Sequence, residues 1–160
     1  MKEIVVVLQN IRSLHNVGSI FRTADAAGID KLYLCGITPS PVNRLGVFEP
    51  KLTKSSLGAE KYVPWEKQYS VATTIKKLKK GGYKIYALEQ DKKSIIYTKV
   101  KPSKNDKIAL LIGNEVNGLP KSILRLADKI IEIPMRGKKE SLNVSVAFGI
   151  AAYELAKFKK

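Results

Sequence analysis

The sequence predicts an α/β fold built on an open, mostly parallel β-sheet with helices on both faces. Two features predict it. Strand-like runs alternate with helical patterns along most of the chain, and those runs are almost wholly apolar, as expected of strands covered on both faces. The length of 160 residues and the 44% hydrophobic content suit one core. We therefore expect residues 1–160 to form a single domain.

The first elements make a β-α-β unit. "EIVVVLQ" (3–9) has the unbroken apolar character of a buried strand, and "NVGSIFRTADAAG" (16–28) has helical spacing and ends at Gly28. "KLYLCG" (31–36) is the second strand. A Pro-containing segment, 37–50, follows without a predicted element.

The remaining elements continue the alternation. "YSVATTIKKLKKGG" (69–82) predicts a helix closed by Gly81 and Gly82, and "YKIYALE" (83–89) predicts a strand. The later elements are the strand "KIALLIG" at 107–113, the short helix "PKSILRLAD" at 120–128, the strand "KIIEIP" at 129–134 and the helix "NVSVAFGIAAYELAKF" at 143–158.

The last helix is apolar on every side. One face carries Val144, Ala147, Phe148, Ala151, Ala152 and Leu155. The other side carries Val146, Ile150 and Tyr153, so the helix needs two apolar neighbours. In so short a chain a second subunit is the expected second neighbour, and we predict a homodimer; the alternative is that one monomer covers both sides.

The net charge of +15 predicts a polyanionic partner such as nucleic acid. Counting Lys and Arg against Asp and Glu gives 13 − 6 = +7 for residues 1–80 and 16 − 8 = +8 for residues 81–160, which favours a basic surface over a basic tail. No run reaches the roughly 18 apolar residues that span a bilayer, and no signal peptide is present, so we expect a cytoplasmic protein without membrane contact.

Several classes of site are disfavoured by the residues present. Cys35, the single cysteine, excludes an internal disulfide, lies in an apolar run where burial is expected, and makes a multi-cysteine metal site impossible; we expect no metal. "GNEVNGLP" (113–120) begins like a phosphate-binding P-loop, but Leu119 and Pro120 stand where its Lys and Ser or Thr belong. No G-x-G-x-x-G is present. His15, the single histidine, lies in a loop where a solvated or capping role is as plausible as acid–base chemistry.

Three polar clusters remain, each at the carboxyl end of a predicted strand or the start of the next helix, where open α/β sheets bind ligands. The first holds Asn16 and Arg22; Asn16 as a helix cap and an Arg22–Asp25 ion pair are the structural alternatives. The second is 113–120, in which Gly113 and Gly118 permit positive φ and close backbone approach to a ligand while Glu115 supplies an acid. The third is "IPMRGKKESLNVS" (133–145), where Ser141 and Asn143 precede the last helix and Ser141 is a possible cap.

These three clusters resemble the three successive motifs of the SpoU/TrmH family of RNA ribose 2′-O-methyltransferases, of the SPOUT class. "TKSSLGAEKYVPW" (53–65) is also similar to the region that links them, so the resemblance spans nearly the whole chain. It implies an enzyme that uses S-adenosyl-L-methionine, a deep trefoil knot near the C-terminus, and a homodimer. Some family members have a separate N-terminal RNA-binding domain, whereas this sequence starts directly in the first predicted strand, so we expect a single methyltransferase domain without one.

The resemblance assigns roles to particular residues. The family's catalytic positions fall on Asn16, Arg22, Glu115, Ser141 and Asn143, and its cofactor contacts, made largely by backbone, fall on Leu88, Gly113, Ile133, Met135 and Leu142. The resemblance also assigns to Arg22 the removal of the proton from the ribose hydroxyl. Because an arginine side chain stays protonated at neutral pH, we favour Arg22 as a clamp for phosphate or the developing alkoxide.

The expected substrate is RNA. Lys138 and Lys139 are candidates for contacts with RNA phosphates. The alternative is that they are solvated lysines of a loop without a binding role. A chain without a separate RNA-binding domain must recruit RNA with its catalytic surface, which favours transfer RNA over ribosomal RNA. Two other functions stay open at this point: a non-catalytic RNA-binding module that retains the fold, and an unrelated nucleotide-dependent enzyme of flavodoxin-like or Rossmann-like build.

Overall fold

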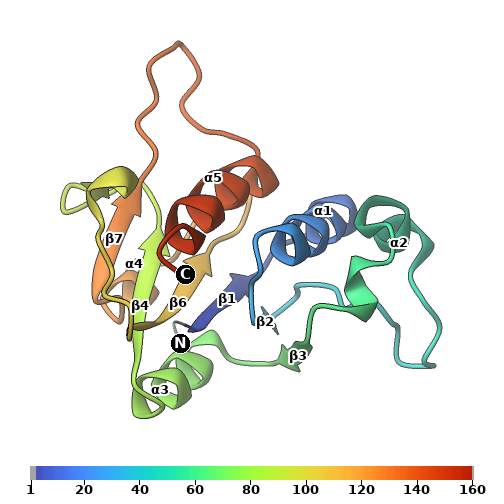
Figure 1. Cartoon of the computed structure of the whole chain (residues 1–160). Coiled ribbons are helices and arrows are strands. Elements are labelled where there is room, and N and C mark those ends of the chain that lie inside the picture. Colours follow the sequence, from blue (N-terminus) through green and yellow to red (C-terminus); the bar gives the residue numbers. More distant parts are fainter. Residues whose placement is uncertain (1–2, 160) are drawn as a thin grey trace.

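A computed structural model describes residues 3–159, and these form one seven-stranded sheet (Figure 1). All of its strand pairs are parallel, and the strand order is β3-β2-β1-β6-β4-β7-β5. The strands are β1 (Glu3–Gln9), β2 (Lys31–Cys35), β3 (Trp65–Gln68), β4 (Tyr83–Leu88), β5 (Ile95–Ile96), β6 (Lys107–Ile112) and β7 (Lys129–Glu132). The helices are α1 (Leu14–Ala26), α2 (Pro50–Ser56), η1 (Ala59–Lys61), α3 (Val71–Lys80), η2 (Tyr97–Lys99), α4 (Lys121–Leu124) and α5 (Val144–Ala156).

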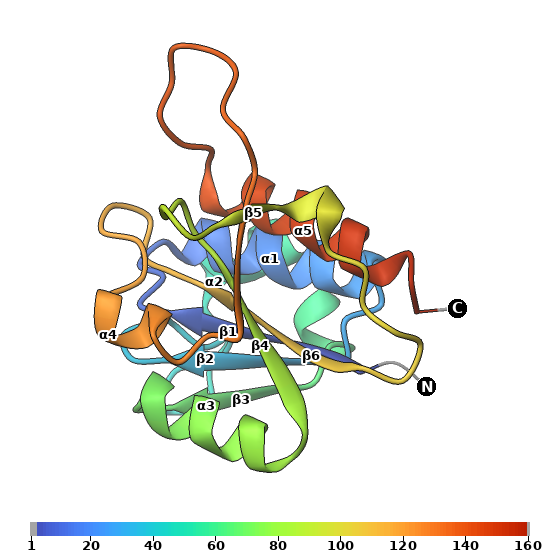
Figure 2. The same cartoon turned by 90° about the vertical axis from the view of Figure 1, so that its left-hand side faces the viewer.

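Helices cover both faces of the sheet, as predicted (Figure 2). Alternate residues of β1 point to opposite faces: Ile4 packs in the core beneath α1, α2 and α5, whereas Val5 packs in the core beneath α3 and α4. The four central strands, β1, β2, β4 and β6, supply most of the strand side chains in these cores. This two-sided burial explains why the strands read as continuous apolar runs.

The predicted strands and helices are confirmed, with shifts at their ends. Helix α1 begins at Leu14, before the expected start, because the Ser13 hydroxyl accepts a hydrogen bond from the Asn16 backbone N–H (3.2 Å) and caps the helix. Asn16 therefore is not the cap. Helix α3 ends at Gly81, as expected.

Five short elements were not predicted. Helix α2 begins at Pro50, and its Ser, Thr and Lys residues give no clear apolar stripe. Strand β3 is an edge strand of sequence "WEKQ" with no fully buried residue, so it lacks the apolar run of the central strands. Strand β5 has two residues, and η1 and η2 are single turns.

The C-terminal half of the sheet has an unusual path. Strand β7 lies between β4 and β5, although β4 and β5 are joined by residues 89–94 alone. The chain then leaves β7, rises in the loop 133–143 and returns as α5, which packs against α1, β6 and η2 (Figures 1 and 2). Among residues 3–159, no helix has the length and apolar character needed to cross a membrane.

Helix α5 buries one side and exposes another. Phe148, Ala151, Ala152 and Leu155 are buried, whereas Val146 and Tyr153 are 50% and 55% exposed. Val146 and Tyr153 are two helical turns apart and lie on one face. The described chain therefore leaves part of the apolar surface of α5 in contact with solvent.

Candidate active site

A cleft opens at the carboxyl edge of the sheet, where β4, β6 and β7 end. The loop 113–120 after β6 and the loop 133–143 after β7 border it, together with the first turns of α5. Its lining consists of Leu88, Glu89, Gln90, Ile112, Gly113, Asn114, Glu115, Val116, Gly118, Glu132, Ile133, Met135, Ser141, Leu142, Val144 and Ala147. All five residues expected to contact a cofactor are in this set, and so are Glu115 and Ser141.

Glu115 is the centre of a hydrogen-bond network at the mouth of the cleft. Its carboxylate accepts from the backbone N–H of Arg12 (3.1 Å to each oxygen) and of Ser13 (3.1 Å). It also accepts from the side-chain amide of Asn16 (3.3 Å). The loop after β6 is thereby attached to the start of α1, about one hundred residues earlier in the chain.

The same network continues to the third polar cluster. The Asn143 side-chain amide donates to the side-chain oxygen of Asn16 (3.2 Å), and the Asn143 oxygen accepts from the backbone N–H of Ser145 (2.9 Å). Asn143 is thus the cap of α5, a role considered for Ser141. Glu115, Asn16 and Asn143 form one hydrogen-bonded chain that joins all three predicted clusters.

The network favours the ionised form of Glu115. Partial burial is the largest single influence and opposes ionisation, but the hydrogen bonds from the backbone N–H groups of Arg12, of Glu115 itself and of Ser13, and from Asn16, together lower the pKa of the Glu115 carboxyl. Glu115 is therefore a fixed negative charge at neutral pH and a poor proton acceptor.

Gly113 and Gly118 allow the loop 113–120 to fold back on itself. A Cβ at Gly113 would lie 2.5 Å from the backbone carbon of Gly118, so residue 113 must lack a side chain for the loop to fold back on itself. Gly118 has φ +62°, in the left-handed region that glycine adopts readily. The close approach at Gly113 is therefore to the backbone of Gly118 and Leu119, whereas the approach to a ligand expected from the sequence stays a prediction.

The electrostatic character of the cleft is acidic. Three carboxylates line it, those of Glu89, Glu115 and Glu132, and among its lining residues there is neither Lys nor Arg. Glu89 and Glu132 were not predicted as site residues, although each stands at the carboxyl end of a strand, the position that identified the other candidates. The floor is apolar, formed by Leu88, Ile112, Ile133, Val144 and Ala147.

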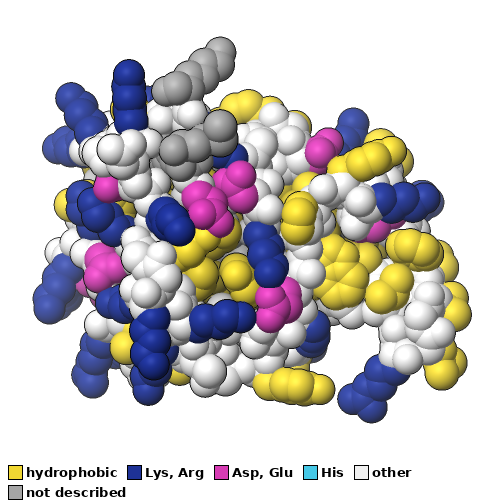
Figure 3. All heavy atoms as spheres, turned by 60° about the horizontal axis from the view of Figure 1, so that its bottom comes forward, with side chains coloured by type: hydrophobic (Ala, Val, Ile, Leu, Met, Phe, Trp, Pro, Cys, Tyr) yellow, Lys and Arg dark blue, Asp and Glu magenta, His cyan; other side chains and the backbone are white. Residues whose placement is uncertain are grey.

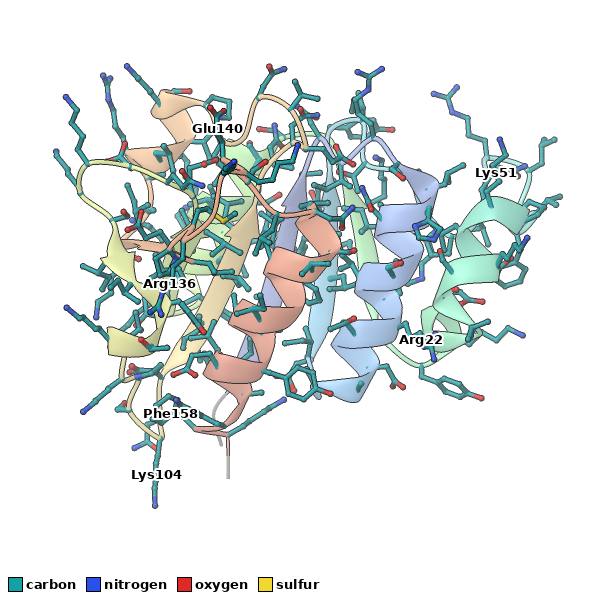
Figure 4. The ribbon with its side chains drawn as sticks, turned by 90° about the horizontal axis from the view of Figure 1, so that it is seen from above. Arg22, Lys51, Lys104, Arg136, Glu140 and Phe158 are labelled. Atoms are coloured by element: carbon teal, nitrogen blue, oxygen red, sulfur yellow. The ribbon has the colours of Figure 1, made fainter. Side chains whose placement is uncertain are left out.

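Arg22 lies outside this cleft. It is exposed on α1 and borders a separate depression with Ser19, Thr23, Ala26, Ser55 and Tyr153. Figure 4 shows it between α1 and α2, on the other side of α5 from Arg136. Within residues 3–159, the ion pairs do not include one between Arg22 and Asp25. The structure therefore does not bring Arg22 together with Glu115 and Asn143 in a single chain.

Lys138 and Lys139 are exposed in the loop 133–143, which stands out from the body of the molecule (Figure 1). A hydrogen bond from the Gln90 side-chain amide to the Glu140 carbonyl oxygen (2.7 Å) ties this loop to the end of β4.

Figure 3 shows Lys and Arg side chains spread over the face near α3 as well, so the positive charge covers a folded surface. His15 is exposed, and Cys35 is buried beside Thr74, where burial raises the pKa of its thiol.

Comparisons with known proteins identify the family of the chain. Residues 3–153 match the model of the SpoU rRNA Methylase family. The chain is 34% identical over 153 residues to the tRNA (guanosine(18)-2′-O)-methyltransferase of Aquifex aeolicus, an alignment that covers 96% of this chain and 68% of that one.

Solved structures share the fold. The AdoMet-bound rRNA methyltransferase of Sinorhizobium meliloti superposes with a TM-score of 0.86 at 29% identity, covering 97% of this chain and 56% of that chain. A structure concerned with 2-OH methylation of C/U34 on tRNA superposes with a TM-score of 0.77 at 29% identity, covering 98% of this chain and 90% of that chain. The chain spans 57% of one curated relative and 68% of another.

Proposed function

The chain belongs to the SpoU rRNA Methylase family, and from that premise we propose that it transfers the methyl group of S-adenosyl-L-methionine to a ribose 2′-hydroxyl of RNA. The observation that carries the proposal is the hydrogen-bonded chain from Glu115 through Asn16 to Asn143. It gathers the three segments that resemble the family's motifs at the mouth of one cleft.

The cleft suits the proposed methyl donor in two respects. Its apolar floor, which includes Leu88 and Ile133, fits a flat adenine ring. Its three carboxylates and its lack of Lys and Arg give it a negative field, which favours a ligand that carries a sulfonium and an ammonium group. When bound, S-adenosyl-L-methionine supplies an activated methyl group. Leu88, Gly113, Ile133, Met135 and Leu142 would hold it.

The residues of the chain have positioning roles in this reaction. Glu115 fixes the backbone of Arg12 and Ser13, and Asn16 and Asn143 fix the entrance of α5 relative to α1. Methyl transfer requires the acceptor oxygen in line with the methyl carbon and sulfur, and such positioning removes several kcal/mol from a barrier. We assign Ser141, which lines the cleft and is exposed, to the acceptor side.

Arg22 acts, in our proposal, from a second copy of the chain. It is separated from the cleft of its own chain, but its depression includes Tyr153, which belongs to the exposed apolar face of α5. A homodimer that buries Val146 and Tyr153 would cover this face and bring Arg22 of the partner subunit towards the cleft. There its guanidinium would clamp a phosphate or the developing alkoxide of the substrate.

The path of the chain around β7 supports a trefoil knot. Strand β7 pairs with both β4 and β5, so it lies beside the connection that leaves β4 and returns to β6. Helix α5 then packs against β6 and η2, and in our proposal the chain is threaded through that connection, an arrangement that is rare in proteins. We propose that this threading holds the loops 113–120 and 133–143 in place around the cleft.

The substrate we propose is transfer RNA, with ribosomal RNA as the alternative. Two of the similar proteins act on transfer RNA, and one of them is covered over 90% of its length. Lys138 and Lys139 project from the loop beside the cleft, where they can contact phosphates. Mapping 2′-O-methylation across total RNA from cells with and without the gene tests the proposal. The loss of a ribose methyl group from a transfer RNA would support it, and an unchanged map would contradict it.

A further inference from the structure

Glu89 is a cleft residue whose backbone position is fixed from two sides. It directly follows Leu88, the last residue of β4, and its N–H donates to the Ile131 carbonyl oxygen (3.0 Å), which extends the β4–β7 pairing by one residue. The Glu89 backbone is therefore anchored at the carboxyl edge of the sheet. The loops 113–120 and 133–143 border the cleft at this same edge.

The Glu89 side chain is also held in place. One carboxylate oxygen accepts from the Leu119 N–H (2.9 Å), and the other accepts from the Gln90 N–H (2.9 Å). Gly118 leaves room for this carboxylate, since a Cβ there would lie 2.2 Å from it. An ionised carboxylate has about four acceptor positions, so each oxygen of Glu89 retains capacity for a further donor.

The other well-held carboxylate of the cleft, that of Glu115, has less capacity. It already accepts from two backbone N–H groups and one side-chain amide. Of the two cleft carboxylates that hydrogen bonds hold in place, Glu89 is the one that can still accept two hydroxyl donors side by side. A vicinal diol presents that pair of donors, and an acid at the end of a strand in an open α/β sheet is a known means of binding a ribose diol.

We propose that Glu89 binds the 2′,3′-diol of the adenosine part of the cofactor and thereby makes the cleft selective for a ribonucleoside. The inference rests on the proposed function, because it requires that an adenosine-containing cofactor binds in this cleft. It adds a contact by a side chain to a set of expected contacts made largely by backbone.

Calorimetric titration of the full chain with S-adenosyl-L-homocysteine and with its 2′,3′-dideoxy analogue tests the proposal. Glu89→Gln keeps an oxygen that can accept from Leu119 but removes the charge. We expect it to weaken binding of S-adenosyl-L-homocysteine about tenfold, in line with the loss of a hydrogen bond to a charged group. Binding of the dideoxy analogue should stay within about twofold of the wild type, because that ligand has no diol to lose.

The outcomes separate a direct contact from an indirect one. If Glu89→Gln weakens both ligands equally, Glu89 only supports the loop 113–120 and the proposal is overturned; it is also overturned if neither ligand is affected. Glu132→Gln, which removes another cleft carboxylate, is the matched control and should affect both ligands alike. If the wild type binds neither ligand, the proposed cofactor itself fails, which is a different result from equal losses in Glu89→Gln.

Discussion

The side-chain amide of Asn143 donates a hydrogen bond of 3.2 Å to the side-chain oxygen of Asn16, a residue 127 positions earlier in the chain. Asn143 also caps α5, so its oxygen and its amide have separate tasks. Asn143→Ser retains a capping oxygen but is too short to reach Asn16. We expect it to leave the free energy of unfolding within about 0.5 kcal/mol of the wild type and to lower the rate of methyl transfer at least about tenfold.

Asn143→Ala is the companion variant, because it removes the cap as well. It should cost about 1 kcal/mol of stability and lose as much activity as Asn143→Ser. Denaturant unfolding and single-turnover methylation measure the two quantities. Equal activity of Asn143→Ser and the wild type would show that Asn143 serves only as a cap.

The Glu115 network predicts a pH dependence of stability. Because its pKa is lowered in the folded protein, ionised Glu115 contributes stability above its ordinary pKa of 4.5, and this contribution is lost as the pH falls below that value. The difference in unfolding free energy between the wild type and Glu115→Gln should therefore be constant from neutral pH to about pH 5 and shrink in more acidic solution. A difference that does not change with pH down to the acid limit of folding would contradict the assignment.

The separation of Arg22 from the cleft predicts activity by complementation. Arg22→Ala removes the guanidinium, and Ala147→Phe fills the cleft; each variant alone should be inactive. If Arg22 acts across a dimer, an equal mixture of the two, unfolded and refolded together, contains mixed dimers with one intact site. Random pairing then restores about a quarter of the wild-type activity.

Two binding measurements are the controls for this experiment. Arg22→Ala must still bind S-adenosyl-L-methionine, which calorimetry shows, and Ala147→Phe must not. An inactive mixture, with mixed dimers shown by mass spectrometry, would place the action of Arg22 within its own chain.

The proposed phosphate contacts of Lys138 and Lys139 should contribute to the salt dependence of RNA affinity. If both bind phosphates, Lys138→Gln with Lys139→Gln should reduce the slope of log affinity against log salt concentration by about 0.7–0.9 for each phosphate that is no longer neutralised. Lys51→Gln with Lys54→Gln, two lysines of α2, is the matched change of charge on another surface. Equal slopes in the two double variants would remove Lys138 and Lys139 from the RNA-binding surface.

The sheet could be predicted from the sequence because its central strands are buried on both faces. That burial makes the interiors of β1 and β6 continuous apolar runs, a strong pattern for a strand, and gives β4 the apolar run Ile85–Leu88 after Lys84. The polar edge strand β3 and the two-residue strand β5 have no such pattern. They form because a neighbouring strand offers hydrogen bonds, and that information is tertiary.

The sequence predicted which residues belong to the candidate site better than it predicted how they are arranged in space. Each polar cluster follows a strand, and the carboxyl ends of parallel strands meet at one edge, which is why Glu115 and Asn143 lie together. The partner of Asn143 could not be derived from spacing, because Asn16 is far away in the chain. For Arg22, closeness in the sequence was misleading. It lies six residues from Asn16 in the sequence but borders a separate depression of the folded chain.

The most direct test of the account is incubation of the protein with S-adenosyl-L-methionine labelled in its methyl group and with transfer RNA or, separately, ribosomal RNA. Complete nuclease digestion and identification of the labelled product follow. The account predicts label in a 2′-O-methylnucleotide, strongly reduced in Asn143→Ser and absent in Arg22→Ala. Label on a nucleobase, or no transfer to transfer RNA or ribosomal RNA by a protein that binds the donor, would contradict it.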